Sequence, residues 1–180
     1  MREQKKRGRP KNKDRQLNQD IIIYMAKTLM REQGVIPSIR GLARALDVDA
    51  MAIYHYFENK NSLLEAISIS LMDSIYFPKQ QLHWQGPLQK LAESYLNLLR
   101  HYSGLLDTLI LMPDNGPMMI FADRFNKVMA PLELDADKQK QAFTLLLSFL
   151  HGQALLLKTE TDEQKEHFDA VFKLYCSLLE

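Results

Sequence analysis

The sequence has few of the residues that crosslink a chain or interrupt regular structure. Its 180 residues include one cysteine, seven glycines and seven prolines. One cysteine excludes a disulfide within the chain and a zinc site built from four thiolates. The longest apolar run, residues 145–157, is too short and too polar at its middle to span a membrane. No apolar stretch follows the charged N-terminus as it would in a signal peptide, so we expect a soluble, cytoplasmic protein.

Helical spacing dominates the apolar pattern. Hydrophobic residues make up 46% of the chain and charged residues 25%, so a chain of this length can bury its own core. Apolar residues recur every three to four positions, and no stretch shows the sustained alternation of a strand. We therefore predict an all-α fold. The predicted helices run from about 22 to 33, 38–46, 50–57, 59 or 62 to 75, 88–102, 104–112, 117–130, 136–158 and 162–179.

Charge is unevenly distributed, although the formal net charge is only +1. Residues 1–15 contain eight basic and two acidic residues, whereas residues 61–180 contain ten basic and fifteen acidic ones. A basic end on an acidic chain predicts a polyanionic partner for that end, and a solubilising tail is the alternative. We divide the chain into a basic arm (residues 1–16), a head (17–65) and a body (66–180).

Two short predicted helices of the head, residues 38–46 and 50–57, are joined by a three-residue turn. This is the geometry of a helix-turn-helix pair that reads DNA. Asp47 occupies the turn position that usually needs a positive φ, which Asp tolerates. The spacing alone equally allows a helical hairpin inside an all-α domain.

A more specific pattern begins in the second of these helices. The segment Ile53-Tyr-His-Tyr-Phe-Glu-Asn-Lys-Asn-Ser-Leu-Leu64 resembles the signature of the tetracycline-repressor (TetR/AcrR) family. Sequence resemblance covers about residues 18–70, and Asp47 departs from the glycine usual in the family. The resemblance implies a three-helix DNA-binding head on an all-helical body that dimerises and binds a ligand. It also implies a homodimeric transcriptional regulator, more often a repressor, that a small molecule releases from a palindromic operator.

The resemblance also implies which head residues contact double-stranded operator DNA. The candidates are Ser38, Arg40, Tyr54, His55 and Lys60, together with the apolar helix tip Ala50, Met51 and Ala52. Arg40 can form a bidentate contact with guanine, and the apolar tip suits thymine methyl groups. Lys60 begins the next helix, where backbone N–H groups and an ammonium together favour a phosphate.

The arm contains Arg7-Gly8-Arg9-Pro10, the core of an AT-hook-like motif. Arg7 and Arg9 suit a narrow minor groove, and Gly8 lets the backbone approach its floor. Nonspecific attraction to phosphates is the alternative interpretation.

The last two predicted helices are apolar on more than one face, so we expect one face to meet a second copy of the chain. The interface candidates are Leu145, Phe149, Gly152, Leu156, Phe168, Phe172, Tyr175 and Leu179. The alternative is that these helices form the core of a monomer.

Flexible methionines and aromatic residues gather in the middle of the body and suit an adaptable pocket for an apolar or aromatic ligand. The candidates are Tyr95, His101, Tyr102, Met112, Met118, Met119, Phe121, Phe125 and Met129. Ordinary core packing is the alternative for each of them.

The sequence contains none of the common catalytic or phosphate-binding motifs and no cluster of metal-ligand residues. We therefore expect no enzyme activity, no metal and no cofactor. The competing function is that of an architectural protein that binds A·T-rich DNA through the arm alone.

Overall fold

The computed structural model describes residues 17–79, 83–102, 104–112, 116–156 and 161–180. Within these ranges the chain is helical and contains no strand, which confirms the predicted all-α fold. The helices are α1 (Gln19–Gln33), α2 (Ile39–Leu46), α3 (Ala50–Tyr54), α4 (Lys60–Met72), α5 (Gln85–His101), α6 (Leu105–Leu111), α7 (Gly116–Met129), the 3-10 turn η1 (Ala130–Leu132), α8 (Ala136–Leu156) and α9 (Asp162–Ser177).

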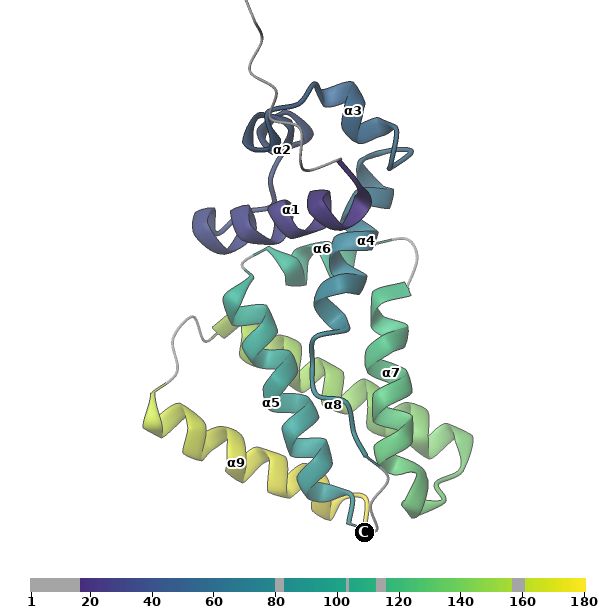
Figure 1. The fold of residues 1–180 in the computed structure, drawn as a ribbon. Helices are drawn as coiled ribbons and strands as arrows, with labels where there is room; N and C mark the ends of the chain where they lie inside the picture. Colours follow the sequence, from purple (N-terminus) through teal and green to yellow (C-terminus); the bar gives the residue numbers. More distant parts are fainter. Residues whose placement is uncertain (1–16, 80–82, 103, 113–115, 157–160) are drawn as a thin grey trace, which may run out of the picture.

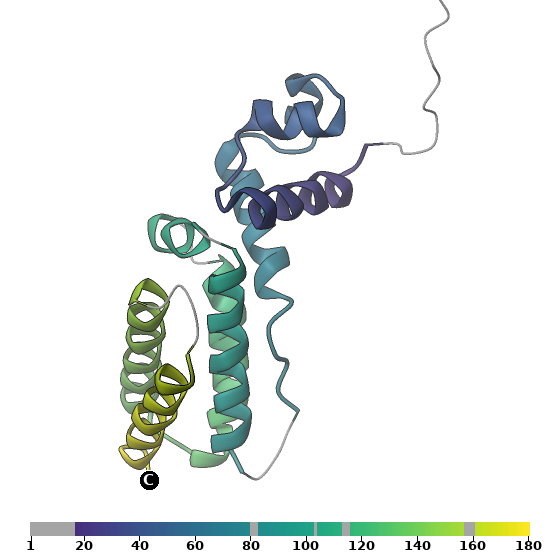
Figure 2. The same ribbon diagram turned by 90° about the vertical axis from the view of Figure 1, so that its left-hand side faces the viewer.

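The head sits on one end of an elongated helical body (Figures 1 and 2). Helices α1, α2 and α3 enclose Ile22, Leu42 and Ile53, none of which is exposed. Helix α4 runs from the head into the body, so a single helix crosses the position where the sequence suggests a domain boundary. Helices α5, α7, α8 and α9 form the long part of the body, and α6 lies beneath α1.

Most helix boundaries follow from local capping. The Asp49 side chain accepts a hydrogen bond from the amide of Met51 at the start of α3, and Gly34 ends α1 with φ 66°. The ambiguous start of α4 resolves at Asn59, whose side chain accepts from the Ser62 amide while the Ser62 hydroxyl accepts from the Asn59 amide.

Four predicted boundaries are wrong by about three residues. Helix α1 begins at Gln19 rather than at residue 22, and α4 ends at Met72 rather than at residue 75. Helix α3 ends at Tyr54 rather than at residue 57, because the chain turns there to bring Phe57 into the core. Helix α5 begins at Gln85 rather than at residue 88. Pro87 lies in its first turn, where a missing amide hydrogen costs no helical hydrogen bond.

Candidate DNA interface and ligand sites

The turn between α2 and α3 has the backbone that the sequence predicts. Asp47 adopts the left-handed conformation with φ 55°, and the Val48 amide donates to the Ala43 carbonyl at 3.0 Å. Leu42 and Ile53 are fully buried where the two helices pack. The chain therefore presents α2 and α3 as a rigid pair at the end of the molecule that is remote from the body.

The predicted DNA-contacting residues divide into exposed and structural groups. Arg40, His55 and Lys60 are exposed, and Tyr54 retains 42% of its surface. Ser38 is also exposed, but its hydroxyl accepts the Gly41 amide at 3.0 Å and caps α2. A side chain at Gly41 would place Cβ 3.2 Å from that hydroxyl oxygen, so the capping serine would have to shift slightly to admit it.

The predicted apolar tip of α3 is smaller than the sequence suggests. Met51 is 64% exposed, whereas Ala50 and Ala52 are only partly exposed and Ala50 packs against the core. Helix α3 turns Ala50 toward the rest of the head, so Met51 offers most of the exposed apolar surface of the tip. Contact between the two alanines and DNA stays a prediction.

Tyr56 links the segment before α1 to the end of the helix-turn-helix. Its hydroxyl donates to the Leu17 carbonyl at 2.6 Å, and the Gln19 side chain donates to the Tyr56 carbonyl at 3.0 Å. These bonds hold the start of the head beside α3. Arg7 and Arg9 lie outside the described residues.

The nine predicted ligand residues do not surround one common cavity. Tyr95, Phe121, Phe125 and Met129 are buried in the body, whereas Met119 is 68% exposed. Met119 is thus a surface residue of α7 and borders none of the cavities described here, so its part in a ligand site stays a prediction. Met112 lies at the junction of head and body, and the pair His101 and Tyr102 borders a different cavity of about 200 Å³.

Tyr95 and His151 form a polar pair inside the otherwise apolar body. The Tyr95 hydroxyl lies 2.9 Å from His151 Nε2 and 3.8 Å from the sulfur of Met118. Burial raises the pKa of Tyr95 and lowers the pKa of His151, because it disfavours both charged forms. Sequence reasoning missed His151. The available signal was a histidine in the longest apolar run of the chain.

The predicted dimer residues of α9 face inward. Phe168, Phe172, Tyr175 and Leu179 are buried within the single chain. Phe168 stacks on Phe149 of α8 with ring centroids 5.5 Å apart. Within the single chain these four side chains therefore pack into the core, as the alternative interpretation has it, and their part in an interface stays a prediction. The large apolar side chains that α8 and α9 leave exposed are Leu145, Leu155, Leu156, Leu174 and Leu178.

Two arginines connect distant parts of the chain. Arg31 of α1 donates to the Tyr102 hydroxyl at 2.7 Å and lies over the same ring, which links the head to the body. Arg124 of α7 is buried and donates to the carbonyls of Met72, Asp73 and Ile75 at 2.6–3.1 Å. It therefore caps the C-terminal end of α4, where a cation also suits the helix dipole.

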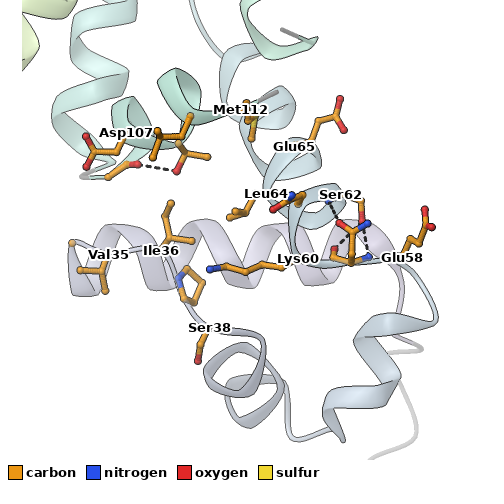
Figure 3. Close-up of a pocket in the computed structure, with 17 residues that line it drawn as sticks. Val35, Ile36, Ser38, Glu58, Lys60, Ser62, Leu64, Glu65, Asp107 and Met112 are labelled. Atoms are coloured by element: carbon orange, nitrogen blue, oxygen red, sulfur yellow. Dashed lines mark hydrogen bonds between the residues drawn. The ribbon is translucent and has the colours of Figure 1, made fainter. Parts of the chain in front are cut away.

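The largest of the cavities described here, about 910 Å³, lies between the head and α6 (Figure 3). Its walls come from residues 34–38, from the start of α4 and from α6. Ser38, Lys60 and Met112 are the predicted site residues that border it. Sequence periodicity could not predict this cavity, because it is formed by segments from the head and the body.

Comparison with known proteins agrees with this arrangement. Residues 22–67 match the family model described as bacterial regulatory proteins, tetR family. This range contains most of α1, all of α2 and α3, and the first part of α4. The chain has the fold of the TetR family. The match and the fold confirm the resemblance drawn from residues 53–64 and show that the head is similar to the DNA-binding domain of that family.

Solved TetR-family structures share the fold at low sequence identity. ActR of Streptomyces coelicolor in complex with actinorhodin superposes with a TM-score of 0.79 at 15% identity, covering 91% of this chain and 95% of that one. BioQ of Mycobacterium smegmatis superposes with a TM-score of 0.75 at 16% sequence identity, covering 91% of this chain and 98% of that one. A single-residue variant of TetR from Acinetobacter baumannii in complex with minocycline superposes with a TM-score of 0.70 at 20% sequence identity, covering 91% of this chain and 95% of that one. No curated protein matches the sequence closely enough to add a relative.

Metal-binding and membrane-spanning features are absent from the described ranges. Within these ranges, no group of three or more His, Cys, Asp or Glu side chains is arranged so that it could hold a metal ion. No described helix combines the length and apolar content needed to cross a membrane.

Proposed function

We propose that this protein is a homodimeric repressor that binds a palindromic operator and leaves it when a small molecule binds. The observation that carries the proposal is the position of the α2–α3 pair at the end of the molecule remote from the body. Arg40, Tyr54 and His55 are exposed on this pair. A BioQ structure that contains its natural operator supports DNA binding by this fold. The ActR and TetR structures with actinorhodin and minocycline support ligand control.

Each exposed head residue has a specific role in this proposal. Arg40 reads a guanine in the major groove, and Met51 contacts a thymine methyl group. Lys60 and the amides at the start of α4 bind one phosphate. Arg7 and Arg9 of the arm enter a neighbouring minor groove rich in A·T pairs.

The homodimer uses the outward faces of α8 and α9. This keeps the predicted Leu145 and Leu156 of α8 and uses Leu174 and Leu178 on α9 in place of the residues predicted there. Leu145, Leu156, Leu174 and Leu178 are exposed on these helices, and burying them against a second copy removes apolar surface from water. Replacing both Leu174 and Leu178 with Glu should give monomers in light scattering. A dimer that persists in this double variant contradicts the assignment.

The ligand binds in the body, where Tyr95 and His151 supply the polar group of an apolar site. The buried ring of Phe121 lies beside Tyr95 with centroids 4.8 Å apart, and the partly buried Phe143 packs against Phe121. A ligand with one hydrogen-bonding group can replace the Tyr95–His151 bond without leaving a buried polar atom unpaired.

Selection of binding sites from random duplexes tests the DNA-binding proposal. We expect one two-fold symmetric sequence. Arg40→Ala should weaken binding to it by about 1–3 kcal/mol, the value of one good base contact. Lys138→Ala, which removes the same charge from the body, should leave affinity nearly unchanged. Enrichment of A·T-rich sequences without symmetry, and no effect of Arg40→Ala, would favour the architectural alternative.

Deletion of residues 1–15 tests the arm separately. Each lost phosphate contact should reduce the slope of log affinity against log salt by about 0.9. An unchanged slope after the deletion excludes contacts between the arm and DNA.

A further inference from the structure

The cavity between the head and α6 is built from both parts of the chain. Val35 and Ile36 of the loop after α1 form one side, Lys60 and Leu64 of α4 form the next, and α6 closes the third (Figure 3). Its volume of about 910 Å³ falls in the range of small-molecule sites. It is separate from the Tyr95–His151 pair, because neither of those residues borders it.

Apolar side chains line this cavity while remaining accessible. Leu111 of α6 is 80% exposed and Val35 is 56% exposed. Ile36, Leu64 and Met112 are partly buried beside them. A bound molecule that covers these side chains would gain the free energy of removing apolar surface from water.

The residues that border the cavity carry charges of both signs. Glu58, Glu65 and Asp107 contribute three carboxylates, and Lys60 contributes one ammonium. The carboxylates do not gather at one point, because Figure 3 shows Glu58 and Glu65 on the α4 side of the cavity and Asp107 on α6. Glu65 lies against the start of α7, since a Cβ built on Gly116 would be 2.9 Å from its carboxylate oxygen. Asp107 is exposed on α6 four residues before Leu111, so it is the carboxylate that shares a helix face with the exposed apolar surface.

We propose that this head–body cavity binds a small organic cation, with its positive charge near Asp107 and its apolar part against Val35, Leu111 and Met112. An organic cation matches both features of the cavity, because it offers apolar surface together with a charge that needs a nearby carboxylate. A neutral or anionic molecule of the same shape satisfies only the apolar walls.

Binding at this place should act on the position of the head. Gly104 at the start of α6 already approaches the head, since a Cβ there would lie 3.8 Å from Ile36 Cγ1. A molecule held between Asp107 and Val35 prefers one spacing of head and body and therefore changes operator affinity. This regulatory effect rests on the proposed function, whereas binding itself does not.

Tetraphenylphosphonium and tetraphenylborate form a suitable pair of probes, because they share a shape and differ in the sign of their charge. Titration calorimetry on the full chain should show one tetraphenylphosphonium bound per chain and at least about tenfold weaker binding of tetraphenylborate. Asp107→Asn should weaken the cation about tenfold, and Leu111→Ser should also weaken it. Glu166→Gln, an equal change of charge on α9, should have no effect.

Three results would overturn the cavity assignment. They are equal affinity for the two probes, equal affinity of Asp107→Asn and Glu166→Gln for the cation, and loss of cation binding in Tyr95→Phe alone, which would place the probe inside the body. Circular dichroism of each variant shows whether the fold is intact, and Glu65→Gln serves as the second cavity variant if Asp107→Asn unfolds.

Operator titration separates the two proposals. A change in operator affinity with saturating tetraphenylphosphonium, lost in Asp107→Asn, supports regulation from the cavity. Normal operator binding that does not respond to the bound cation overturns the regulatory effect alone. Failure to bind any selected duplex with or without the cation overturns the proposed function, while the calorimetry still decides the binding site.

Discussion

Arg124 offers the most direct test of how the body holds the helix that carries the head. Its side chain is 6% exposed, and its guanidinium donates to the Met72, Asp73 and Ile75 carbonyls at 3.1, 3.1 and 2.6 Å. The Asp73 carboxylate lies 3.6 Å away but is largely exposed, so removing Arg124 leaves no buried charge unpaired.

The expected cost of Arg124→Met follows from these three bonds. A hydrogen bond to a charged donor contributes about 1.5–3 kcal/mol, and water can replace part of that near the exposed end of α4. Arg124→Met also removes the free-energy cost of burying a guanidinium, and this offsets a further part of the stability lost with the three hydrogen bonds. We therefore expect the free energy of unfolding to fall by about 2–4 kcal/mol. Arg124→Lys should lose about half as much, because an ammonium cannot span three carbonyls.

Urea unfolding at a fixed protein concentration measures the loss, and Lys127→Met is the matched control. Lys127 lies on the same helix, but it pairs with Asp123 at the surface. Its substitution should therefore lower the free energy of unfolding by less than about 1 kcal/mol. Hydrogen exchange should also accelerate at the amides of residues 73–75. If Arg124→Met is no less stable than Lys127→Met and exchange is unchanged, the cap does not hold α4.

Three further predictions concern single residues. Asp47→Gly should raise the free energy of unfolding by about 0.5–1 kcal/mol and Asp47→Val should lower it by about 1–2 kcal/mol, because φ is 55° there; equal urea midpoints would contradict this. The lowered pKa of His151 means that the unfolded chain binds a proton first as the pH falls below 6.5, so thermal stability should drop in that range and drop less in His151→Gln; parallel pH curves would exclude the effect. Tyr56→Phe should cost about 1 kcal/mol and speed exchange near Gln19, since it removes the bond to Leu17; unchanged exchange would show that the bond does not fix this end.

Core packing separates the faces of α9 in a way that the sequence could not. Both faces of that helix carry large apolar residues, so periodicity alone cannot say which face meets the same chain and which is left outside. The structure buries Phe168 and Phe172 and leaves Leu174 and Leu178 exposed. The helices that pack against α9 determine which of its faces is buried, and these helices are distant in the sequence.

Local chemistry alone determined much of the head. Asn59, Asp49 and Gly34 mark helix ends through bonds and backbone angles that involve only near neighbours, and the turn at Asp47 follows from the same short-range rules. The family resemblance of residues 53–64 also needed no tertiary information. By contrast, the Tyr95–His151 pair, the Arg124 cap and the cavity beside Asp107 join residues separated by about fifty positions or more. Such contacts depend on how whole helices pack, and helical periodicity carries no information about which helices become neighbours.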